Sequence, residues 1–306
     1  MAKPKYEEYC DGEPTYRVRE KHQGANIYAQ NAKSLLTKAS GFISSYDFTL
    51  NPYRGCQYGC SYCYAAAFSP NSKMRQDWGN WLIIKENARE VLEKELIRWH
   101  NKNPDQLPRI YMSTVTDPYQ PIEAKEELTQ SLLDLMGEYR VILVIQTRSP
   151  LIIRDIPQLQ RIQHLRINMT IPTGSEQVRK DFEPRSPSIK ARLKAVKLIK
   201  QSIDDSKGFV PKISITITPT LPTPVAEQEA FIQQLKIADR IVIQEFHTSS
   251  RSSLVASTRQ EALALKRKYA WWYDNEQQNY QQFKDKLVSL LPEIEIKEGK
   301  AGFGYD

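Results

Sequence analysis

Short strand-forming runs alternate with amphipathic stretches along most of the chain. Short runs of closely spaced apolar residues, several of them rich in valine and isoleucine, predict six strands, at residues 46–51, 109–114, 140–146, 165–171, 212–218 and 240–246. Apolar residues at helical spacing predict intervening helices, at residues 87–100, 122–137, 152–163, 188–202 and 225–238. Continuous apolar strands are expected where both faces of a parallel sheet are buried. The pattern therefore predicts an α/β fold of repeated βα units, either a barrel or an open doubly wound sheet.

The two ends of the chain depart from this alternation. Residues 1–45 are polar and interrupted by glycine and proline, so we expect an irregular extension or cap outside the core. Residues 257–290 have the spacing of one or two amphipathic helices. Their aromatic residues are expected to pack against the core: Trp271, Trp272, Tyr273 and Tyr280. We expect three parts: an N-terminal extension (1–45), a core domain (46–250) and a C-terminal helical extension (251–306).

The composition is that of an ordinary globular protein. Of the 306 residues, 26% are charged and 40% are hydrophobic, which argues against a disordered, collagen-like or coiled-coil chain. A chain of this length buries roughly three quarters of its unfolded surface and needs no disulfides for stability. The apolar runs are far shorter than the ~20 residues that cross a bilayer, and the N-terminus carries no apolar signal core. We therefore expect a soluble, cytoplasmic protein.

Most of the excess positive charge is concentrated in one segment. The chain carries 43 basic and 36 acidic residues, a net charge of +7, and residues 179–200 alone contribute 8 − 2 = +6. The basic residues of this basic stripe are Arg179, Lys180, Arg185, Lys190, Arg192, Lys194, Lys197 and Lys200. Such a stripe could attract the phosphate backbone of a nucleic acid. The alternative is an ordinary solvated helix face.

Three of the four cysteines lie within eight positions, in a loop after the first predicted strand. Cys56, Cys60 and Cys63 have the spacing Cys-x3-Cys-x2-Cys, and each thiolate can bind one iron of a [4Fe–4S] cluster, which leaves the fourth iron without a protein ligand. A structural zinc site would need a fourth ligand, commonly from a second Cys/His pair. The four histidines are scattered, and Cys10 has no obvious mate. The loop therefore favours a cluster over zinc.

Three motifs together resemble one known family. They are NPYRGCxxGCxYCYA around the cysteines, VTDPYQPIE at 115–123 and FEPRSP at 182–187. The sequence resembles the radical S-adenosylmethionine (radical SAM) superfamily, in the branch related to spore photoproduct lyase and described as DNA repair photolyase-like. The resemblance covers residues 46–247. It implies a partial (β/α)6 TIM-type barrel with the iron–sulfur cluster at the carboxyl ends of the strands, where parallel barrels place their reactive groups.

The resemblance also implies the chemistry. The cofactors are a [4Fe–4S] cluster, bound by Cys56, Cys60 and Cys63, and S-adenosylmethionine (SAM) bound at the open iron. Reductive cleavage of SAM yields a 5′-deoxyadenosyl radical that abstracts hydrogen from a substrate, and the protein supplies orientation and a dry cavity. An electron donor of the flavodoxin or ferredoxin type is the implied partner.

Further site residues follow from matching the family's motifs. Tyr62 matches an aromatic residue near the adenine, and Tyr62 and Tyr64 match tyrosines implicated in hydrogen transfer, which makes both catalytic candidates. Ser113, Thr114 and Asp117 lie at the end of the second strand, where the superfamily holds the amino group of SAM. Packing of the loop is the alternative for the tyrosines, and a turn-forming role is the alternative for Asp117.

Two cofactor-binding candidates lie on later strands. Arg148, after the third strand, stands where the lyases have a lysine near the cofactor carboxylate, a contact that arginine can make bidentately. Thr170, on the fourth strand, matches a hydroxyl residue near the ribose or carboxylate. A surface arginine and a buried strand threonine are the structural alternatives.

One position departs from the lyases. Their hydrogen-donating cysteine at the end of the second strand corresponds to Thr114, whose hydroxyl is a poor hydrogen-atom donor. Repair of spore photoproduct itself is therefore in doubt: either the chemistry differs and consumes SAM, or a tyrosine or an exogenous donor completes the cycle.

The sequence leaves three functions open. The first is a radical SAM enzyme whose substrate is unidentified, with nucleic acid favoured because of the basic stripe and the family's repair member. The second is a radical-based enzyme that modifies a peptide or protein, with the C-terminal aromatic residues as a docking surface. The third is a non-catalytic iron–sulfur protein, although a simple electron carrier would be expected to supply a fourth cysteine ligand.

Overall fold

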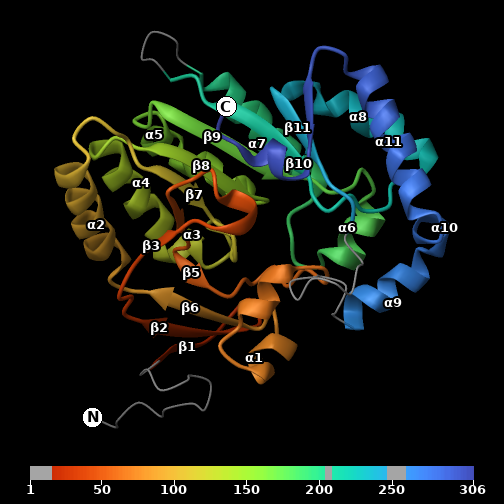
Figure 1. Cartoon of the computed structure of the whole chain (residues 1–306). Helices are drawn as coiled ribbons and strands as arrows, with labels where there is room; N and C mark the ends of the chain where they lie inside the picture. The colour runs from red at the N-terminus through yellow and green to blue at the C-terminus, as the bar shows by residue number, and fades with distance from the viewer. Residues whose placement is uncertain (1–15, 204–208, 247–259) are drawn as a thin grey trace.

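The computed structural model describes residues 16–203, 209–246 and 260–306, and its main feature is an eight-stranded sheet (Figure 1). Six neighbouring strands are parallel: β4 (Phe48–Leu50), β7 (Arg109–Met112), β8 (Ile142–Thr147), β9 (His164–Thr170), β10 (Lys212–Ile217) and β11 (Arg240–Ile243). They lie in chain order and confirm the six predicted strands. β3 (Leu36–Lys38) pairs antiparallel with β4, and β12 (Glu295–Glu298) pairs parallel with β11. Among the described strands, β3 and β12 are the free edges, so the fold is a partial barrel.

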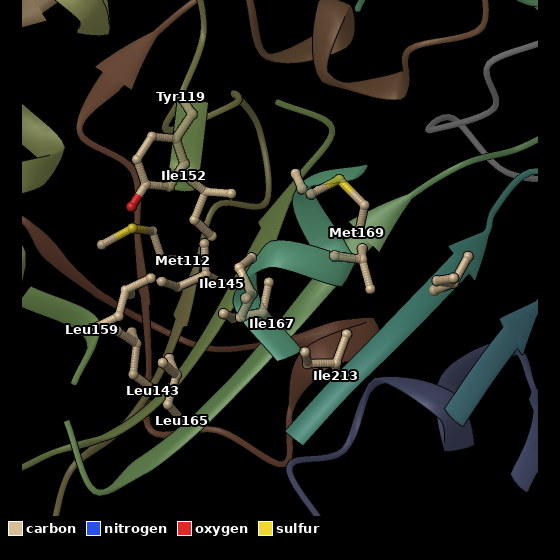
Figure 2. Close-up of a cluster of buried hydrophobic side chains, with 14 of the residues drawn as sticks. Met112, Tyr119, Leu143, Ile145, Ile152, Leu159, Leu165, Ile167, Met169 and Ile213 are labelled. Carbon is tan, nitrogen blue, oxygen red and sulfur yellow. The ribbon is translucent and has the colours of Figure 1, made fainter. Parts of the chain in front are cut away.

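The two faces of this sheet differ in chemistry. On the outer face, Leu143 and Ile145 of β8 and Ile167 of β9 pack against Ile152 and Leu159 in the main hydrophobic core (Figure 2). The inner face is also buried but largely polar. Its side chains include Gln146 on β8, Asn168 and Thr170 on β9, and Ser214 and Thr216 on β10. Both faces are covered, as predicted. The strands were predicted as apolar runs, but the side chains that point to the inner face are largely polar.

Helices cover the outer face (Figure 1). They are α2 (Ala88–Lys102), α4 (Leu128–Glu138), α5 (Ile156–Leu159), α7 (Ile189–Gln201) and α8 (Val225–Gln234). The helix predicted over 122–137 is split into α3 (Glu123–Glu126) and α4, because Glu127 adopts φ 51°. The helix predicted over 152–163 is a 3-10 turn, η3 (Pro150–Asp155), followed by α5, and Pro157 near the start of α5 has no N–H to donate.

The start of α2 lacks a local side-chain cap. The segment 87–90 has the side chains of a capping box, but Asn87 makes no side-chain hydrogen bond to the helix. Its amide instead accepts a hydrogen bond from the backbone N of Ala32 at 2.7 Å and donates to the carbonyl of Ala32 at 3.1 Å. A long-range contact has therefore replaced the local cap.

The N-terminal extension is ordered where the structure describes it, so the prediction of an irregular segment is wrong for residues 16–45. β1 (Tyr16–His22) and β2 (Ala25–Gln30) join β6 (Trp81–Lys85) and β5 (Tyr53–Arg54) in a second sheet of order β1-β2-β6-β5. Ala25 and Ile27 are fully buried in the main core. β1 pairs only with β2 among the described strands, and β2 joins the sheet through β6, which lies more than 50 residues away in the sequence. The domain boundary at residue 45 stays a prediction.

The C-terminal part contains three helices within the described residues, one more than expected: α9 (Gln260–Lys268), α10 (Ala270–Tyr273) and α11 (Glu276–Leu290). Trp272 and Tyr280 are buried, as predicted, whereas Trp271 is about half exposed. The start of the predicted helical stretch, at 257–259, lies outside the described residues, as do Cys10 and His247. Within the described ranges, no helix is long and apolar enough to cross a membrane.

The last residues close one end of the barrel. Tyr46 donates to the carbonyl of Phe303 at 2.6 Å, and Arg166 donates to the carbonyl of Tyr305 at 2.7 Å. Arg240 binds the carbonyls of Gly304 and Asp306. Tyr46, Arg166 and Arg240 lie before or near the starts of β4, β9 and β11. This end is therefore filled by protein, and the carboxyl ends of the strands, which we call the mouth, form the opposite end.

Candidate functional site

The three cysteines lie in a loop that two glycines shape. Gly55 and Gly59 have φ values of +88° and +59°, a region that residues with a Cβ rarely adopt. A Cβ on Gly55 would lie 2.7 Å from the Trp81 ring, so the loop also needs a small residue there. Hydrogen bonds from Gly59 N to Cys56 O (3.3 Å) and from Cys63 N to Cys60 O (3.2 Å) make each interval between cysteines a tight turn.

Aromatic residues surround this loop. Cys56 and Cys60 are buried and Cys63 is partly exposed. They belong to a cluster that includes Tyr58, Tyr62, Trp78, Trp81, Phe182 and Phe246. Burial raises the pKa of the Cys60 thiol to about 12 and that of Cys56 well above its usual value. Because thiolates are the metal-binding form, a bound metal centre must displace these protons.

The arrangement of the cysteines fits a cluster better than a single ion. Tetrahedral zinc, with Zn–S bonds of about 2.3 Å, needs its sulfurs about 3.8 Å apart. In the described part of the chain, no group of three or more His, Cys, Asp or Glu residues could hold a single metal ion. Three thiolates that bind three different irons of a cubane need not converge in this way. The donor set of three thiols on one loop therefore suits a [4Fe–4S] cluster.

A buried carboxylate, Glu183, anchors the charged side chains beside the loop. It forms ion pairs with Arg148, from the end of β8, and with Arg192, from α7, and it accepts a hydrogen bond from Tyr62. Glu183 and Arg192 are fully buried. Burial alone would raise the pKa of Glu183, but the positive charges of Arg148 and Arg192 hold it below its usual value. We call these four residues the Glu183 cluster.

The Glu183 cluster reaches the cysteines directly. Nη1 of Arg148 lies 2.9 Å from Sγ of Cys60 and 3.0 Å from the hydroxyl of Tyr62. The guanidinium also lies over the Tyr62 ring, 5.9 Å from its centroid. A cation therefore stands against one of the three thiols, where it favours the thiolate.

The FEPRSP segment wraps around the cysteine loop. The carbonyl of Phe182 accepts hydrogen bonds from the backbone N (2.9 Å) and the hydroxyl (3.2 Å) of Ser61. Arg185 donates to the carbonyl of Gly79, and the hydroxyl of Ser186 lies 3.9 Å from Sγ of Cys60. This motif holds the loop in place and supplies Glu183.

The VTDPYQPIE segment supports the loop from the other side. Thr116 donates to the carbonyl of Gly55 at 2.6 Å, and the side chain of Gln120 accepts from the backbone N of Gln57 at 2.8 Å. The carbonyl of Tyr119 accepts a hydrogen bond from the hydroxyl of Tyr58 at 3.1 Å. The two downstream motifs thus converge on the cysteine motif in space.

Asp117 acts as a brace between strand ends. Its carboxylate accepts hydrogen bonds from Tyr119 N (2.9 Å), Thr147 Oγ1 (2.7 Å) and Arg148 N (2.9 Å). Burial raises its pKa, against these hydrogen bonds and the charge of Arg148. Both carboxylate oxygens bind protein donors, a geometry that favours the turn-forming alternative over a contact with SAM. The cofactor-binding role of Asp117 stays a prediction.

The other predicted residues of the second strand lie at the mouth. Ser113 is buried, and its hydroxyl has no hydrogen-bond partner among the described residues. The backbone carbonyl of Thr114 accepts a hydrogen bond from the hydroxyl of Tyr64, whose side chain is about half exposed. Asn51, which the sequence analysis did not single out, accepts hydrogen bonds from the backbone N of Thr114 (3.0 Å) and of Val115 (3.1 Å).

Thr170 belongs to a polar network inside the barrel. Its hydroxyl accepts hydrogen bonds from Gln146 at 2.6 Å and from Thr216 at 3.1 Å. Gln146 also accepts from the hydroxyl of Tyr111 at 2.8 Å. The observed contacts therefore match the alternative of a buried strand threonine, and its role in cofactor binding stays a prediction.

Sequence reasoning missed the residues that tie these parts together. Glu183 lies in a motif that the sequence analysis quoted, but no role was assigned to it. Arg192 was counted only as part of the basic stripe. A glutamate and an arginine nine residues apart carry no local signal of burial, and charged residues are almost never fully buried unless paired.

The basic stripe does not form one continuous charged surface. Arg179 is buried and paired with Glu176, Arg192 is buried in the Glu183 cluster, and Lys200 pairs with Asp239. Arg185 donates to Gly79 and Asn80. Four lysines remain exposed: Lys180, Lys190, Lys194 and Lys197. The eight cations are therefore not all free on one surface, and contact of the remaining exposed lysines with a nucleic acid stays a prediction.

Comparison with protein families gives one clear match. The model of the radical SAM superfamily matches residues 50–244. An uncharacterized protein of Methanocaldococcus jannaschii is 32% identical over 166 residues, which are 54% of this chain and 60% of that protein. An uncharacterized protein of Mycobacterium bovis is 26% identical over 189 residues, 58% of this chain and 53% of that protein. The chain thus spans between half and two thirds of the length of these relatives.

Solved structures share the fold at low sequence identity. Spore photoproduct lyase complexed with dinucleoside spore photoproduct has a TM-score of 0.60 at 13% identity, covering 92% of this chain and 86% of the lyase. A mutant of that lyase with bound AdoMet and dinucleoside spore photoproduct has a TM-score of 0.60 at 14% identity, covering 90% and 82%. At this level of identity the likeness concerns the fold.

Proposed function

The chain belongs to the radical SAM superfamily, and on that premise we propose that Cys56, Cys60 and Cys63 hold a [4Fe–4S] cluster at the mouth of the barrel. Members of this superfamily use such a cluster together with SAM. The observation that carries the proposal is the cysteine loop, in which three thiols lie on tight turns within a cluster of aromatic residues. When both cofactors are bound, they supply methionine and a 5′-deoxyadenosyl radical, by reductive cleavage of the S–C5′ bond of SAM.

The protein's own residues exclude water and orient the cofactors. The aromatic side chains around Cys56 and Cys60 keep solvent from the thiolates, which strengthens every electrostatic interaction there. The unpartnered hydroxyl of Ser113 is a suitable donor to SAM, because a buried polar atom without a partner is costly unless a ligand satisfies it. A one-electron reductant is also required, and we propose one of the flavodoxin or ferredoxin type.

The two tyrosines next to Cys63 have different proposed roles. The hydroxyl of Tyr62 is buried and donates to Glu183, so Tyr62 is better suited to position the loop than to meet a substrate. Tyr64 is about half exposed, and its hydroxyl contacts the backbone of Thr114, the residue at the donor-cysteine position of the lyases. Tyr64 is therefore our candidate for hydrogen transfer to a substrate radical.

We favour nucleic acid as the substrate class. The support is the set of three motifs shared with the lyase branch and the fold shared with a lyase that binds dinucleoside spore photoproduct. The exposed lysines of α6 (Glu176–Phe182) and α7 provide a weak, sequence-independent attraction to phosphates. Exact repair of spore photoproduct is not part of this proposal, because Thr114 replaces the donor cysteine.

Anaerobic reconstitution tests the cofactor site. We expect one cubane cluster per chain and release of 5′-deoxyadenosine from SAM under reductant. Cys56→Ala, Cys60→Ala and Cys63→Ala should each abolish both signals. Cys10→Ala is the matched control and should retain both. Undiminished cleavage of SAM by any of the three variants would refute the assignment of the ligands.

Isotope transfer tests the substrate class. In separate anaerobic incubations, the enzyme is given SAM, reductant and either deuterated DNA or RNA oligonucleotides or deuterated peptides, and 5′-deoxyadenosine is analysed for deuterium. Transfer of label is expected from at least one oligonucleotide. If label comes from peptides and from no oligonucleotide, the substrate proposal is wrong while the cofactor site stands.

A further inference from the structure

Arg148 makes a direct contact with a proposed cluster ligand. Its Nη1 lies 2.9 Å from Sγ of Cys60, and the guanidinium side chain is only 16% exposed. The uncharged hydroxyl of Ser186 lies farther from this sulfur, at 3.9 Å. The mouth therefore contains an N–H···S hydrogen bond from a partly buried cation.

Several further contacts hold this guanidinium in place. Arg148 pairs with Glu183 and lies 3.0 Å from the hydroxyl of Tyr62. Glu183 is itself held by Arg192, which is fully buried. At the backbone, the N–H of Arg148 donates to Asp117 at 2.9 Å. Because Nη1 contacts both Cys60 and Glu183, a movement of the guanidinium away from Cys60 would also disturb its ion pair with Glu183.

We propose that Arg148 is a positioning residue that raises the reduction potential of the cluster bound through Cys60. This inference rests on the proposed function. A cluster gains negative charge when it is reduced, and hydrogen bonds to its sulfurs are one of the factors that set its potential. A donated N–H and a positive charge at Cys60 favour the reduced state, and the low-dielectric surroundings strengthen both effects. Glu183 offsets part of the charge and fixes the geometry.

This role differs from the one that the sequence resemblance implies. The resemblance places Arg148 near the carboxylate of SAM, whereas the structure directs Nη1 to Cys60 and Glu183. The two roles can be separated experimentally. A contact with the SAM carboxylate affects the binding of SAM, whereas a contact with the thiolate affects the potential of the cluster in the absence of SAM.

A redox titration without SAM tests the inference. Wild type, Arg148→Gln, Arg148→Lys and the control Arg154→Gln are reconstituted anaerobically, and the reduced cluster is followed by electron paramagnetic resonance. Arg154 is a matched control because it is also partly buried and paired with two acidic residues, Glu123 and Asp155. It has no described contact with the cysteines.

We expect Arg148→Gln to disfavour cluster reduction at least tenfold, which is a shift of 59 mV toward negative potential for one electron. Arg148→Lys keeps the positive charge but loses the planar guanidinium group with its several N–H donors. Its reduction potential should therefore shift in the same direction by a smaller amount. Arg154→Gln should titrate like wild type. If Arg148→Gln fails to assemble a cluster, the inference is tested by Arg148→Lys alone, whose cluster should have a more negative reduction potential than the wild-type cluster.

Three outcomes would overturn the inference. One is a cluster-loaded Arg148→Gln protein with the wild-type potential and only weaker SAM binding, which would assign Arg148 to the SAM carboxylate. Another is an Arg148→Lys protein with the wild-type potential where the glutamine variant binds no cluster. The third is an equal shift in Arg154→Gln, which would mean a general loosening. A wild-type protein that binds no cluster would refute the proposed function instead, and this inference with it.

Discussion

Replacement of Glu183 by glutamine removes a negative charge that the buried Arg192 and the partly buried Arg148 share. Arg192 is fully buried and Arg148 is 16% exposed at its side chain. Loss of one partner from a buried ion pair typically costs about 3–5 kcal/mol, because the remaining charge stays buried and uncompensated. Glutamine keeps the shape and one hydrogen-bond acceptor, so we expect Glu183→Gln to lower the free energy of unfolding by about 3 kcal/mol.

The pH dependence of this loss follows from the pKa of Glu183. Its folded-state pKa lies below its usual value, because Arg148 and Arg192 outweigh the effect of burial. A depressed carboxyl pKa contributes stability that is present above the unfolded pKa of about 4.3 and is lost as pH falls through the folded value. The difference in stability between wild type and Glu183→Gln should therefore be full at pH 7 and shrink below pH ~4.

Urea denaturation of the apo proteins at pH 7 and at several values below pH 5 measures this difference. Asp134→Asn is the matched control, because Asp134 pairs with Arg161 on the surface. Exposed pairs contribute about 0–1 kcal/mol, so this variant should lose little stability at any pH. A Glu183→Gln protein that loses no more than Asp134→Asn, or a loss that does not depend on pH, would refute the proposed role of the buried carboxylate.

Two further substitutions test other parts of the molecule. Gly55→Ala should lower the free energy of unfolding by about 2–4 kcal/mol, from backbone strain at φ +88° plus a clash with Trp81. Gly24→Ala, at φ +85° with nothing within 4 Å, should lose only the strain of about 1–2 kcal/mol; equal losses in thermal or urea denaturation would contradict the clash. If the exposed lysines contact nucleic acid, joint charge reversal at Lys194 and Lys197 should flatten the salt dependence of binding by about two phosphate contacts. If fluorescence anisotropy titrations show an unchanged slope of log affinity against log salt concentration, the lysines of α7 form an ordinary solvated helix face and do not contact nucleic acid.

The sequence predicted the elements well and their contacts poorly. All six parallel strands were predicted because each is a short run with closely spaced apolar residues, a pattern that is apparent from the local sequence. β1 and β2 were missed because the pair is joined to the rest of the fold through β2 and β6, which are more than 50 residues apart in the sequence. Asn87 shows the same limit. Its position predicts a helix cap, but its side chain instead hydrogen-bonds to the backbone of Ala32, 55 positions away.

The site divides in the same way. The spacing of Cys56, Cys60 and Cys63 is a property of one loop, so the sequence alone indicated three thiols in one place and the class of centre that they suit. That Arg148 would reach Cys60 could not be predicted, because the two are 88 residues apart in different βα units. Only the curvature of the sheet and the wrapping of the FEPRSP segment bring them together.

The amino-acid order by itself determined the alternation of strands and helices and the donor set of the loop, since both depend on neighbours along the chain. Tertiary structure alone decided which charges of the 179–200 segment remain on the surface and which are buried around Glu183. The physical reason is that a charged side chain is stable inside a protein only where an opposite charge meets it, and that meeting is set by packing between distant segments.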